Sequence, residues 1–403
     1  MTKLHFNYKD VFRSLRLGFS AKKIWMMFIG LLVGFAGYGL LTYLAYLAAG
    51  CDLVTVWEAY RLLPFPEPFF ATFPWYSWTL YGIGVLLFIA SVLLSGTAVS
   101  KVTFEQLRGD EFYESREAFR FAFRQWSSVL GSPALVLAFI LIIAVFGLIL
   151  SALGAIPYFG EMFVALLAVP ALAASFFILY LGIVLAFGLL IGPSIVGATK
   201  NDTFDTIFEV FSCANEQPAR LCLYLGTAAG LAKVGTLAFG VATSLAVRIG
   251  HFILALFMGG KLSEAMSNAA YYFKVALPSW TPGAVRSAFE SFANIIGVPQ
   301  LYLPGEYVSV NWAGDVAALL IGVALYCVAV TVLAYGCSVW YSANTLTYVV
   351  LARKKDEKNL LESPEEEELI EPANRTGAPH HTNSAAKATE TPHPDSTGDK
   401  GPE

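Results

Sequence analysis

The chain has few charged side chains and lacks the short motifs that mark many enzymes. Only 14% of its 403 residues are Asp, Glu, Lys or Arg, whereas 56% are hydrophobic. The sequence contains no Gly-rich phosphate loop, H-E-x-x-H zinc motif or G-x-S-x-G nucleophile turn. His251 is the one histidine outside the terminal segments, and no paired nucleophile or carboxylate accompanies it. These absences argue against an enzyme, and the short basic clusters do not indicate nucleic-acid binding.

Cysteine is scarce as well. The five cysteines show no C-x-x-C spacing, and four of them lie in apolar stretches or on the predicted cytoplasmic side. We interpret these four as reduced, small apolar side chains. Cys51 alone is predicted near the outer face, without an obvious partner. We therefore expect no disulfide framework, no metal and no other cofactor.

Long apolar stretches are what the sequence does contain. Six of them reach the about 20 residues that span the hydrocarbon core of a bilayer. They are residues 25–49, 78–99, 134–156, 162–192, 221–247 and 316–343. The segment before the first stretch is too polar for a cleavable signal peptide. The pattern predicts an all-α membrane protein with six transmembrane helices.

Lys and Arg are concentrated in alternate loops, and this bias predicts the orientation. They are frequent before the first stretch, after the second, and from Arg353 to Lys358 after the sixth. The 50–77 loop has only Arg61, and the 157–161 turn has none. We therefore predict three transmembrane hairpins that open outward, with both termini in the cytoplasm.

A short segment with apolar residues at helical spacing precedes each odd-numbered span. We predict that each such segment forms an amphipathic helix at the cytoplasmic interface of the membrane. The apolar positions are Val11, Phe12, Leu15 and Phe19; Ala118, Phe119, Ala122, Phe123 and Trp126; and Phe204, Ile207, Phe208 and Phe211. One interpretation is a three-fold repeat of interfacial helix and hairpin. The other is chance similarity, because amphipathic helices are common in membrane proteins.

The charges on these predicted helices indicate different neighbours. Arg116, Arg120 and Arg124 recur every fourth residue beside the aromatic stripe. Anionic headgroups attract such cations by about 1 kcal/mol each, so these arginines are candidate lipid contacts. The third helix carries acidic residues instead, with Asp202 or Thr203 as its N-cap. We expect its Phe stripe to pack on the helix bundle.

Two outward segments are long enough to fold. Residues 51–77 are rich in proline and aromatic side chains, which excludes a continuous helix and favours anchoring at the bilayer interface. In the larger external region, 248–312, we predict one helix over Lys261–Leu277 and a second that begins at Thr281-Pro282. Together they would form an external helical cap.

Lys233 is the one charge well inside a predicted span. It lies about 18 Å along a helix that starts near Leu221, close to mid-membrane. A cation there costs roughly 2.5–3.5 kcal/mol, and no carboxylate is predicted at its depth. One hypothesis is that Lys233 binds an anionic ligand or a lipid phosphate in a polar cavity. The other is that the span is shifted or tilted, so that the side chain reaches the interface or bonds carbonyls.

Proline and glycine interrupt two spans. The uncharged stretch from Met162 to Thr199 is too long to cross straight, which predicts a kink at Pro170 or a break near Gly192. Broken helices line transporter sites, but most membrane Pro and Gly residues only aid packing. Gly30-x-x-x-Gly34 allows close contact with another helix and does not by itself indicate dimerisation.

The C-terminal segment differs in composition from the rest. Residues 356–403 contain 12 acidic and 4 basic residues and almost no apolar residue after Ile370. Such a chain cannot bury enough surface to offset its conformational entropy, so we predict a disordered acidic cytoplasmic tail. It would serve as a tether or docking arm, or else be a solvated, dispensable extension.

Two segments carry a resemblance to known proteins. They are Glu105–Ala122, which contains Glu105-Gln106-Leu107-Arg108-Gly109-Asp110, and Ser342-Ala343-Asn344-Thr345-Leu346-Thr347-Tyr348. The chain resembles an uncharacterised family of bacterial six-span membrane proteins. More loosely, it is similar to the membrane domain of some glycerophosphodiester phosphodiesterases, without their metal-binding catalytic domain. The resemblance implies a bacterial inner-membrane setting and supplies no catalytic residues.

These observations lead to two functional hypotheses for a chain organised as an amphipathic segment (1–24), a six-helix domain (25–355) and a tail (356–403). The first is a non-enzymatic scaffold or accessory protein that binds lipid or a partner membrane protein. The alternative is a transporter or channel for a small or lipidic anion, which would use Lys233.

Overall fold

The computed structural model describes residues 8–66, 73–273, 277, 281–296, 307–356 and 360–362. The chain divides into two units, Met1–Leu361 and Glu362–Glu403. Every helix described below belongs to the first unit. The predicted disordered tail lies outside the described residues beyond Glu362.

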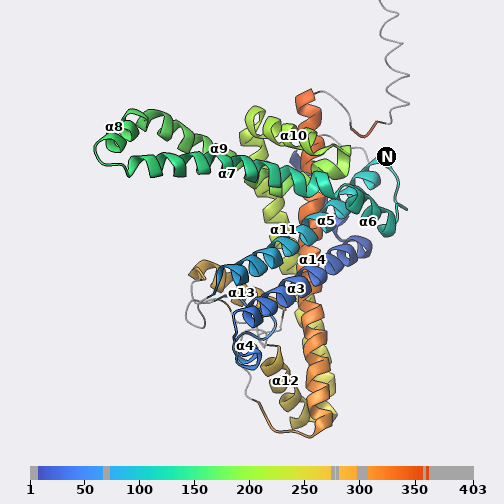
Figure 1. Ribbon diagram of the computed structural model, residues 1–403. Coiled ribbons are helices and arrows are strands. Elements are labelled where there is room, and N and C mark those ends of the chain that lie inside the picture. Colours follow the sequence, from blue (N-terminus) through green and yellow to red (C-terminus); the bar gives the residue numbers. More distant parts are fainter. Residues whose placement is uncertain are drawn as a thin grey trace, which may run out of the picture. The chain divides into compact units, whose positions relative to one another are not determined.

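Six helices in the described residues are long and apolar enough to cross a membrane. They are α3 (Ala21–Ala48), α5 (Trp75–Arg108), α7 (Trp126–Gly154), α9 (Ala168–Thr199), α11 (Pro218–Met258) and α14 (Trp312–Asp356). Figure 1 labels them along the chain. The regular structure of the described residues consists of helices, without an extended strand. This confirms the predicted all-α class.

The long helices run past several predicted ends. Helix α5 continues to Arg108, α11 to Met258 and α14 to Asp356. A helix can continue through polar residues beyond an apolar stretch until a residue that ends helices follows. For α5 that signal is Gly109, whose φ of 106° closes the helix while its amide N–H bonds the Gln106 carbonyl.

The predicted fourth span is two helices. Helix α8 (Phe159–Leu166) ends before α9 begins at Ala168, so the break precedes Pro170. Pro170 then lies in the first turn of α9, where a missing N–H removes no helical hydrogen bond. The predicted break near Gly192 is wrong, because α9 continues through Pro193 to Thr199.

Shorter helices connect or cap the long ones. They are α1 (Tyr8–Val11), α2 (Ser14–Gly18), α4 (Leu53–Tyr60), α6 (Ser115–Arg124), α8, α10 (Thr203–Glu216), α12 (Gly260–Tyr272) and α13 (Gly283–Ile296). The N-terminal segment forms two short helices in place of the single predicted one. Helix α12 ends at Tyr272, before the predicted Leu277, and α13 begins one residue after Pro282.

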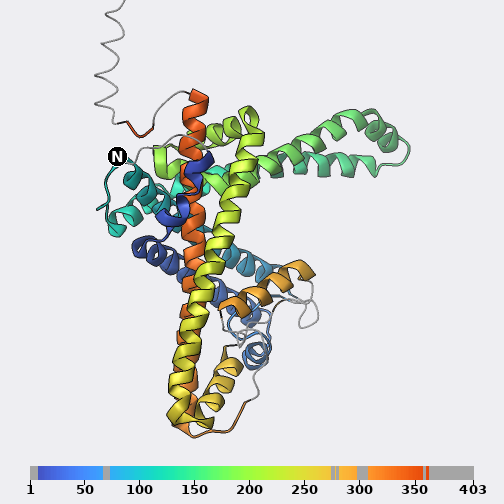
Figure 2. The same ribbon diagram turned by 180° about the vertical axis from the view of Figure 1, so that it is seen from behind.

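The long helices lie side by side in sequential pairs, α3 with α5, α7 with α9 and α11 with α14. Figures 1 and 2 show the third pair from opposite sides. Helix α14 also contacts α2, α3, α5 and α9, so it joins the pairs.

Small residues allow the first pair to pack closely. Ser91 of α5 donates its hydroxyl to the Gly30 carbonyl of α3 at 2.6 Å. Gly34, one turn later, faces the Phe88 ring. The Gly30-x-x-x-Gly34 spacing therefore serves a contact within this chain.

Polar side chains join α5, α9 and α14 where these helices meet. The hydroxyls of Ser100 and Ser194 lie 3.2 Å apart, as do those of Thr103 and Ser342. Asn344 donates its amide to an α9 carbonyl at 3.1 Å. These hydrogen bonds between helices offset part of the cost of burying these groups, although the side-chain carbonyl oxygen of Asn344 is buried without a partner among the described residues. The 342–348 segment that carries the family resemblance is thus part of the packed core.

Helix α10 packs two of its four predicted stripe positions, Ile207 and Phe211, on the bundle. Phe204 and Phe208 are 62% and 70% exposed, while Ile207 and Val210 are buried. The prediction that the Phe stripe packs on the bundle is therefore wrong for Phe204 and Phe208. Asp202 occupies the N-cap position, and its side chain makes no capping hydrogen bond.

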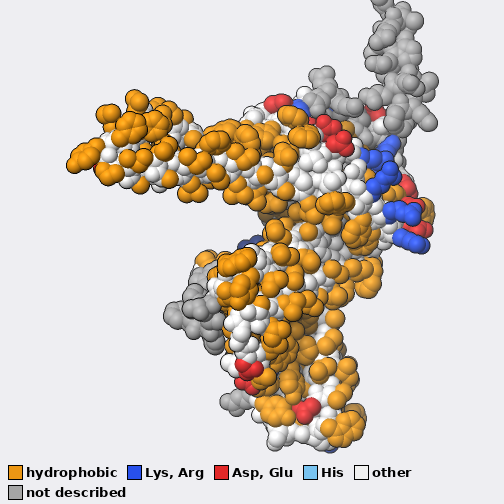
Figure 3. All heavy atoms as spheres, viewed as in Figure 1, with side chains coloured by type: hydrophobic (Ala, Val, Ile, Leu, Met, Phe, Trp, Pro, Cys, Tyr) orange, Lys and Arg blue, Asp and Glu red, His pale blue; other side chains and the backbone are white. Residues whose placement is uncertain are grey.

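Apolar side chains cover the surface of α7, α8 and α9, as Figure 3 shows for one face. Exposed examples are Phe146, Leu148, Met162 and Phe176, each more than 60% exposed. An exposed apolar surface of this kind suits contact with lipid rather than water.

Candidate functional site

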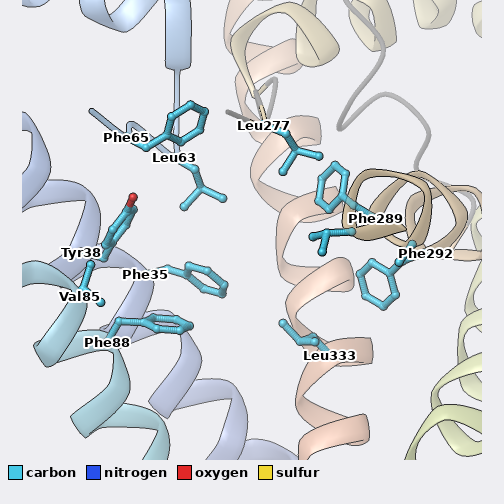
Figure 4. A pocket seen from close by; sticks show the side chains of 12 residues that line it. Phe35, Tyr38, Leu63, Phe65, Val85, Phe88, Leu277, Phe289, Phe292 and Leu333 are labelled. Atoms are coloured by element: carbon cyan, nitrogen blue, oxygen red, sulfur yellow. The ribbon is translucent and has the colours of Figure 1, made fainter. Parts of the chain in front are cut away.

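An apolar pocket of about 570 Å³ is a candidate site in the described residues. Its first wall comes from α3 and α5. Phe35 and Tyr38 project from α3, and Val85 and Phe88 project from α5. Figure 4 shows the rings of Phe35 and Phe88 extending toward the opposite wall. The volume falls within the about 300–1,000 Å³ that is typical of small-molecule sites.

Helices α13 and α14 form the second wall. Val285, Ala288, Phe289 and Phe292 come from α13, and Leu333 comes from α14. Their positions in α13 are separated by three or four residues, so they share one face of that helix. One face of α13 thus supplies one side of the pocket, although the pocket itself was not predicted.

Leu63, Phe65 and Leu277 line one end of the pocket. Tyr38 is the one lining residue with a hydroxyl, and that hydroxyl donates to the Pro64 carbonyl at 2.7 Å. Its polar group is therefore satisfied by the protein. The described lining residues carry no charged side chain, so the pocket suits an apolar chain.

The pocket lies beside the middle of the long helices. Phe35 is about 21 Å from the start of α3 at a rise of 1.5 Å per residue. Phe292 packs against a buried cluster that includes Ala329 and Val332, in the middle of α14. A site at this depth in a membrane-crossing helix faces hydrocarbon, where burial of each additional methylene of a ligand contributes about 0.8 kcal/mol relative to water.

Arg61 lies two residues before the pocket residue Leu63 and is only 6% exposed. Its guanidinium carbon is 4.4 Å from the centroid of the Tyr271 ring and 5.9 Å from that of Trp57. Within the described part of the chain it forms no ion pair. Cation–π contacts of this kind contribute about 0.5–2 kcal/mol. That is less than the several kcal/mol that burial of an ion costs.

The Arg61 backbone is also unusual. Arg61 has φ 53° and ψ −118° at the end of α4, a region that favours glycine. Helix α4 itself is fixed by Asp52, which caps it and accepts hydrogen bonds from Thr55 that lower the pKa of the Asp52 carboxyl. The Arg61 carbonyl accepts a hydrogen bond from the Tyr43 hydroxyl. Such backbone strain, about 1–3 kcal/mol, persists where the surroundings hold it and is concentrated at functional sites.

Tyrosines and a carboxylate adjoin Tyr271. Tyr307 packs against Tyr271 and Tyr272, with ring centroids 5.7 and 6.3 Å apart. The hydroxyls of Tyr272 and Tyr307 each lie 3.3 Å from an Asp315 carboxylate oxygen and donate to it. Burial and the adjacent Asp315 charge raise the pKa of Tyr272. Asp315 therefore accepts hydrogen bonds from two tyrosine hydroxyls and forms no ion pair with Arg61.

Of the predicted site residues, Lys233 lies on an exposed side of α11. It is not among the residues that line the apolar pocket. The part of the chain that the structure describes supplies Lys233 with no hydrogen bond and no carboxylate within 4 Å. An exposed lysine on a long apolar helix can extend its stem along that helix toward an interface.

The predicted basic stripe lies on α6. Arg116, Arg120 and Arg124 are all exposed, whereas Ala118 and Ala122 on the other side are fully buried. Figure 3 shows Lys and Arg side chains gathered in the region of α6 and absent from the visible face of α7–α9. The arginines and Lys233 lie on different helices, and the residues of the pocket are distinct from both.

Sequence reasoning missed the pocket and the environment of Arg61. One signal was present, because Arg61 is the single cation of an outer loop rich in aromatic residues. Its contact with Tyr271, more than 200 residues away, could not be inferred from that pattern. Among the described residues no group of three or more His, Cys, Asp or Glu side chains could hold a metal ion.

Comparisons of the chain with protein-family models, curated proteins and solved structures found no match. The argument for function therefore comes from the geometry of the chain itself.

Proposed function

We propose that this chain is a non-enzymatic, multi-pass membrane protein that holds a lipid acyl chain in its apolar pocket. In this role it acts as an accessory or scaffold protein for lipid or for a partner membrane protein. The observation that carries the proposal is the pocket between α3–α5 and α13–α14, whose lining is apolar and whose one hydroxyl is already bonded. An acyl chain is the ligand that such a lining accepts without leaving polar groups unpaired.

A photoreactive lipid tests this proposal. A phospholipid with a diazirine at the middle of one acyl chain should label peptides that contain Phe88 and Phe289 after excess lipid is removed. The reason is that a retained chain would contact both walls of the pocket, whereas loosely bound lipid is lost. Peptide mapping by mass spectrometry locates the label. Labelling confined to the exposed surface of α7 and α9 would contradict the proposal.

We also propose that the protein resides in a bacterial inner membrane, with three hairpins, cytoplasmic termini and an outer cap formed by α12 and α13. The alternating distribution of Lys and Arg supports this orientation. In it, Arg116, Arg120 and Arg124 of α6 face the anionic headgroups of the inner leaflet, which attract them by about 1 kcal/mol each.

Two native cysteines test the orientation. Cys222 is exposed at the start of α11, and Cys51 is partly exposed beyond α3. A membrane-impermeant maleimide should label Cys51 in intact spheroplasts and should label Cys222 only after permeabilisation. Labelling of Cys222 from outside would contradict the proposed orientation. The basic stripe on α6 would then not face the inner leaflet. Peptide mapping distinguishes the two sites.

Anion transport that uses Lys233 is the competing function. No contact of the described residues favours it, because Lys233 is exposed and lines no pocket. Lipid binding is therefore the function that the geometry supports best.

A further inference from the structure

We infer that Arg61 anchors the phosphate of an outer-leaflet phospholipid whose acyl chain occupies the apolar pocket. This inference rests on the proposed function and adds the chemical class of the ligand and the residue that selects it. The site combines a buried cation with an adjoining apolar pocket, which matches the two parts of a phospholipid.

The first argument is that, within the described residues, no carboxylate lies within ion-pair distance of the Arg61 guanidinium. Arg61 is 6% exposed, and its described neighbours are the aromatic rings of Trp57 and Tyr271. The adjacent carboxylate of Asp315 accepts hydrogen bonds from Tyr272 and Tyr307 instead. A guanidinium offers donors in a planar fork that matches two phosphate oxygens, so a phosphate would supply the missing charge and acceptors.

The second argument is that arginine occupies a position suited to glycine. Gly259, at the end of α11, has nearly the same conformation, with φ 52° and ψ −127° against 53° and −118° for Arg61. An arginine in this conformation is strained, whereas glycine is not. The guanidinium at this strained position lies against the Tyr271 ring. If the guanidinium binds a ligand, that binding explains why arginine and not glycine occupies the position.

The third argument connects Arg61 to the pocket. The Cα atoms of Arg61 and Leu63 lie within about 7 Å of each other, because each residue spans at most about 3.6 Å. On the other side, Tyr271 stacks on Arg61 and Leu277 of the same segment lines the pocket. The two chain segments that hold the cation therefore also form one end of the pocket. A lipid could place its phosphate at Arg61 and extend its chain toward Phe35 and Phe88.

Native mass spectrometry of the purified full chain tests the inference with two lipids that share acyl chains. Dioleoyl phosphatidylglycerol carries a phosphate, and dioleoylglycerol does not. Arg61→Gln and Arg61→Gly should each reduce retention of the first lipid by about tenfold and leave the second unchanged. Arg61→Gly also relieves the backbone strain, so misfolding would not explain a loss of lipid retention in this variant. Arg61→Lys keeps the charge but lacks the planar fork, so it should retain phosphatidylglycerol better than Arg61→Gln and less well than the wild type. Lys261→Gln, which removes an exposed outer cation, should match the wild type.

The outcomes separate this inference from the proposed function. If the Arg61 variants retain phosphatidylglycerol while Val85→Phe/Ala288→Phe loses it, the pocket binds lipid and the anchoring role is wrong. If the wild type retains neither lipid, both proposals fail. Inorganic phosphate is the third probe. Equal binding of phosphate alone, lost in Arg61→Gln, would indicate a site for a soluble anion and overturn the lipid assignment.

Discussion

Gly197→Leu should prevent the unit Met1–Leu361 from folding, although leucine is the better helix former by about 0.8–1 kcal/mol. Gly197 of α9 faces the backbone of α5. A Cβ atom at this position would lie 2.8 Å from the Ser100 Cβ and 3.1 Å from the Lys101 amide nitrogen. Helix α5 cannot easily move away, because it also packs against α3 and α14. We expect a loss of about 3 kcal/mol or more.

The matched control is Gly182→Leu in the same helix. No atom lies within 4 Å of the position that a Cβ would take at Gly182. This variant should be as stable as the wild type or slightly more stable. The thermal unfolding midpoint in detergent is measured by circular dichroism, and the monodisperse fraction is measured by size-exclusion chromatography. A Gly197→Leu protein with an unchanged midpoint would show that α5 and α9 do not cross closely at this point.

Hydropathy predicts the six long helices well because each apolar stretch is longer than about 20 residues and contains few charges. It predicts their ends less well. Helices α5 and α14 extend through Arg108 and Asp356, where the sequence is already polar. A hydropathy window detects the part of a helix that suits hydrocarbon, whereas the helix itself continues until a residue such as Gly109 ends it.

Periodicity identified the apolar stripe of α10, but only part of this stripe packs on the bundle. Ile207 is buried and Phe211 packs against the core, whereas Phe208 is 70% exposed. In a soluble protein an aromatic stripe is usually buried in the core. In a membrane protein lipid is also an apolar solvent, so an apolar side chain can face outward. Hydrophobicity alone therefore could not distinguish the packed positions from the exposed ones.

The candidate site could not be predicted from local sequence for a different reason. Its walls come from α3, α5, α13 and α14, which are separated by up to about 300 residues along the chain. Each helix alone carries an ordinary apolar face. The pocket arises only where α13 packs against α11 and α14. By contrast, the basic stripe on α6 depends on a single helix, and its arginines are exposed on one side as predicted.

Filling the pocket should abolish lipid retention without unfolding the protein. In the double variant Val85→Phe/Ala288→Phe, one added ring comes from each wall. Both rings would occupy space that is now empty and apolar, and each buried square ångström of apolar surface contributes about 25 cal/mol. The unfolding midpoint should therefore stay constant or rise, while retained lipid falls at least about tenfold, because the acyl chain loses its binding surface.

A second double variant distinguishes occlusion from a general effect of added phenylalanine. Leu86→Phe/Ser287→Phe alters positions adjacent to the first pair, and neither Leu86 nor Ser287 lines the pocket. At about 100° per residue, Ser287 projects from the opposite side of α13 to Phe289 and Phe292. This control should retain lipid as the wild type does. Equal loss in both variants would mean that lipid binds on the outer surface of α5 and α13. A lower midpoint for the first variant would mean that the pocket is tighter than its volume indicates. Loss of lipid in the first variant alone, at an undiminished midpoint, requires that the acyl chain lies between the two walls.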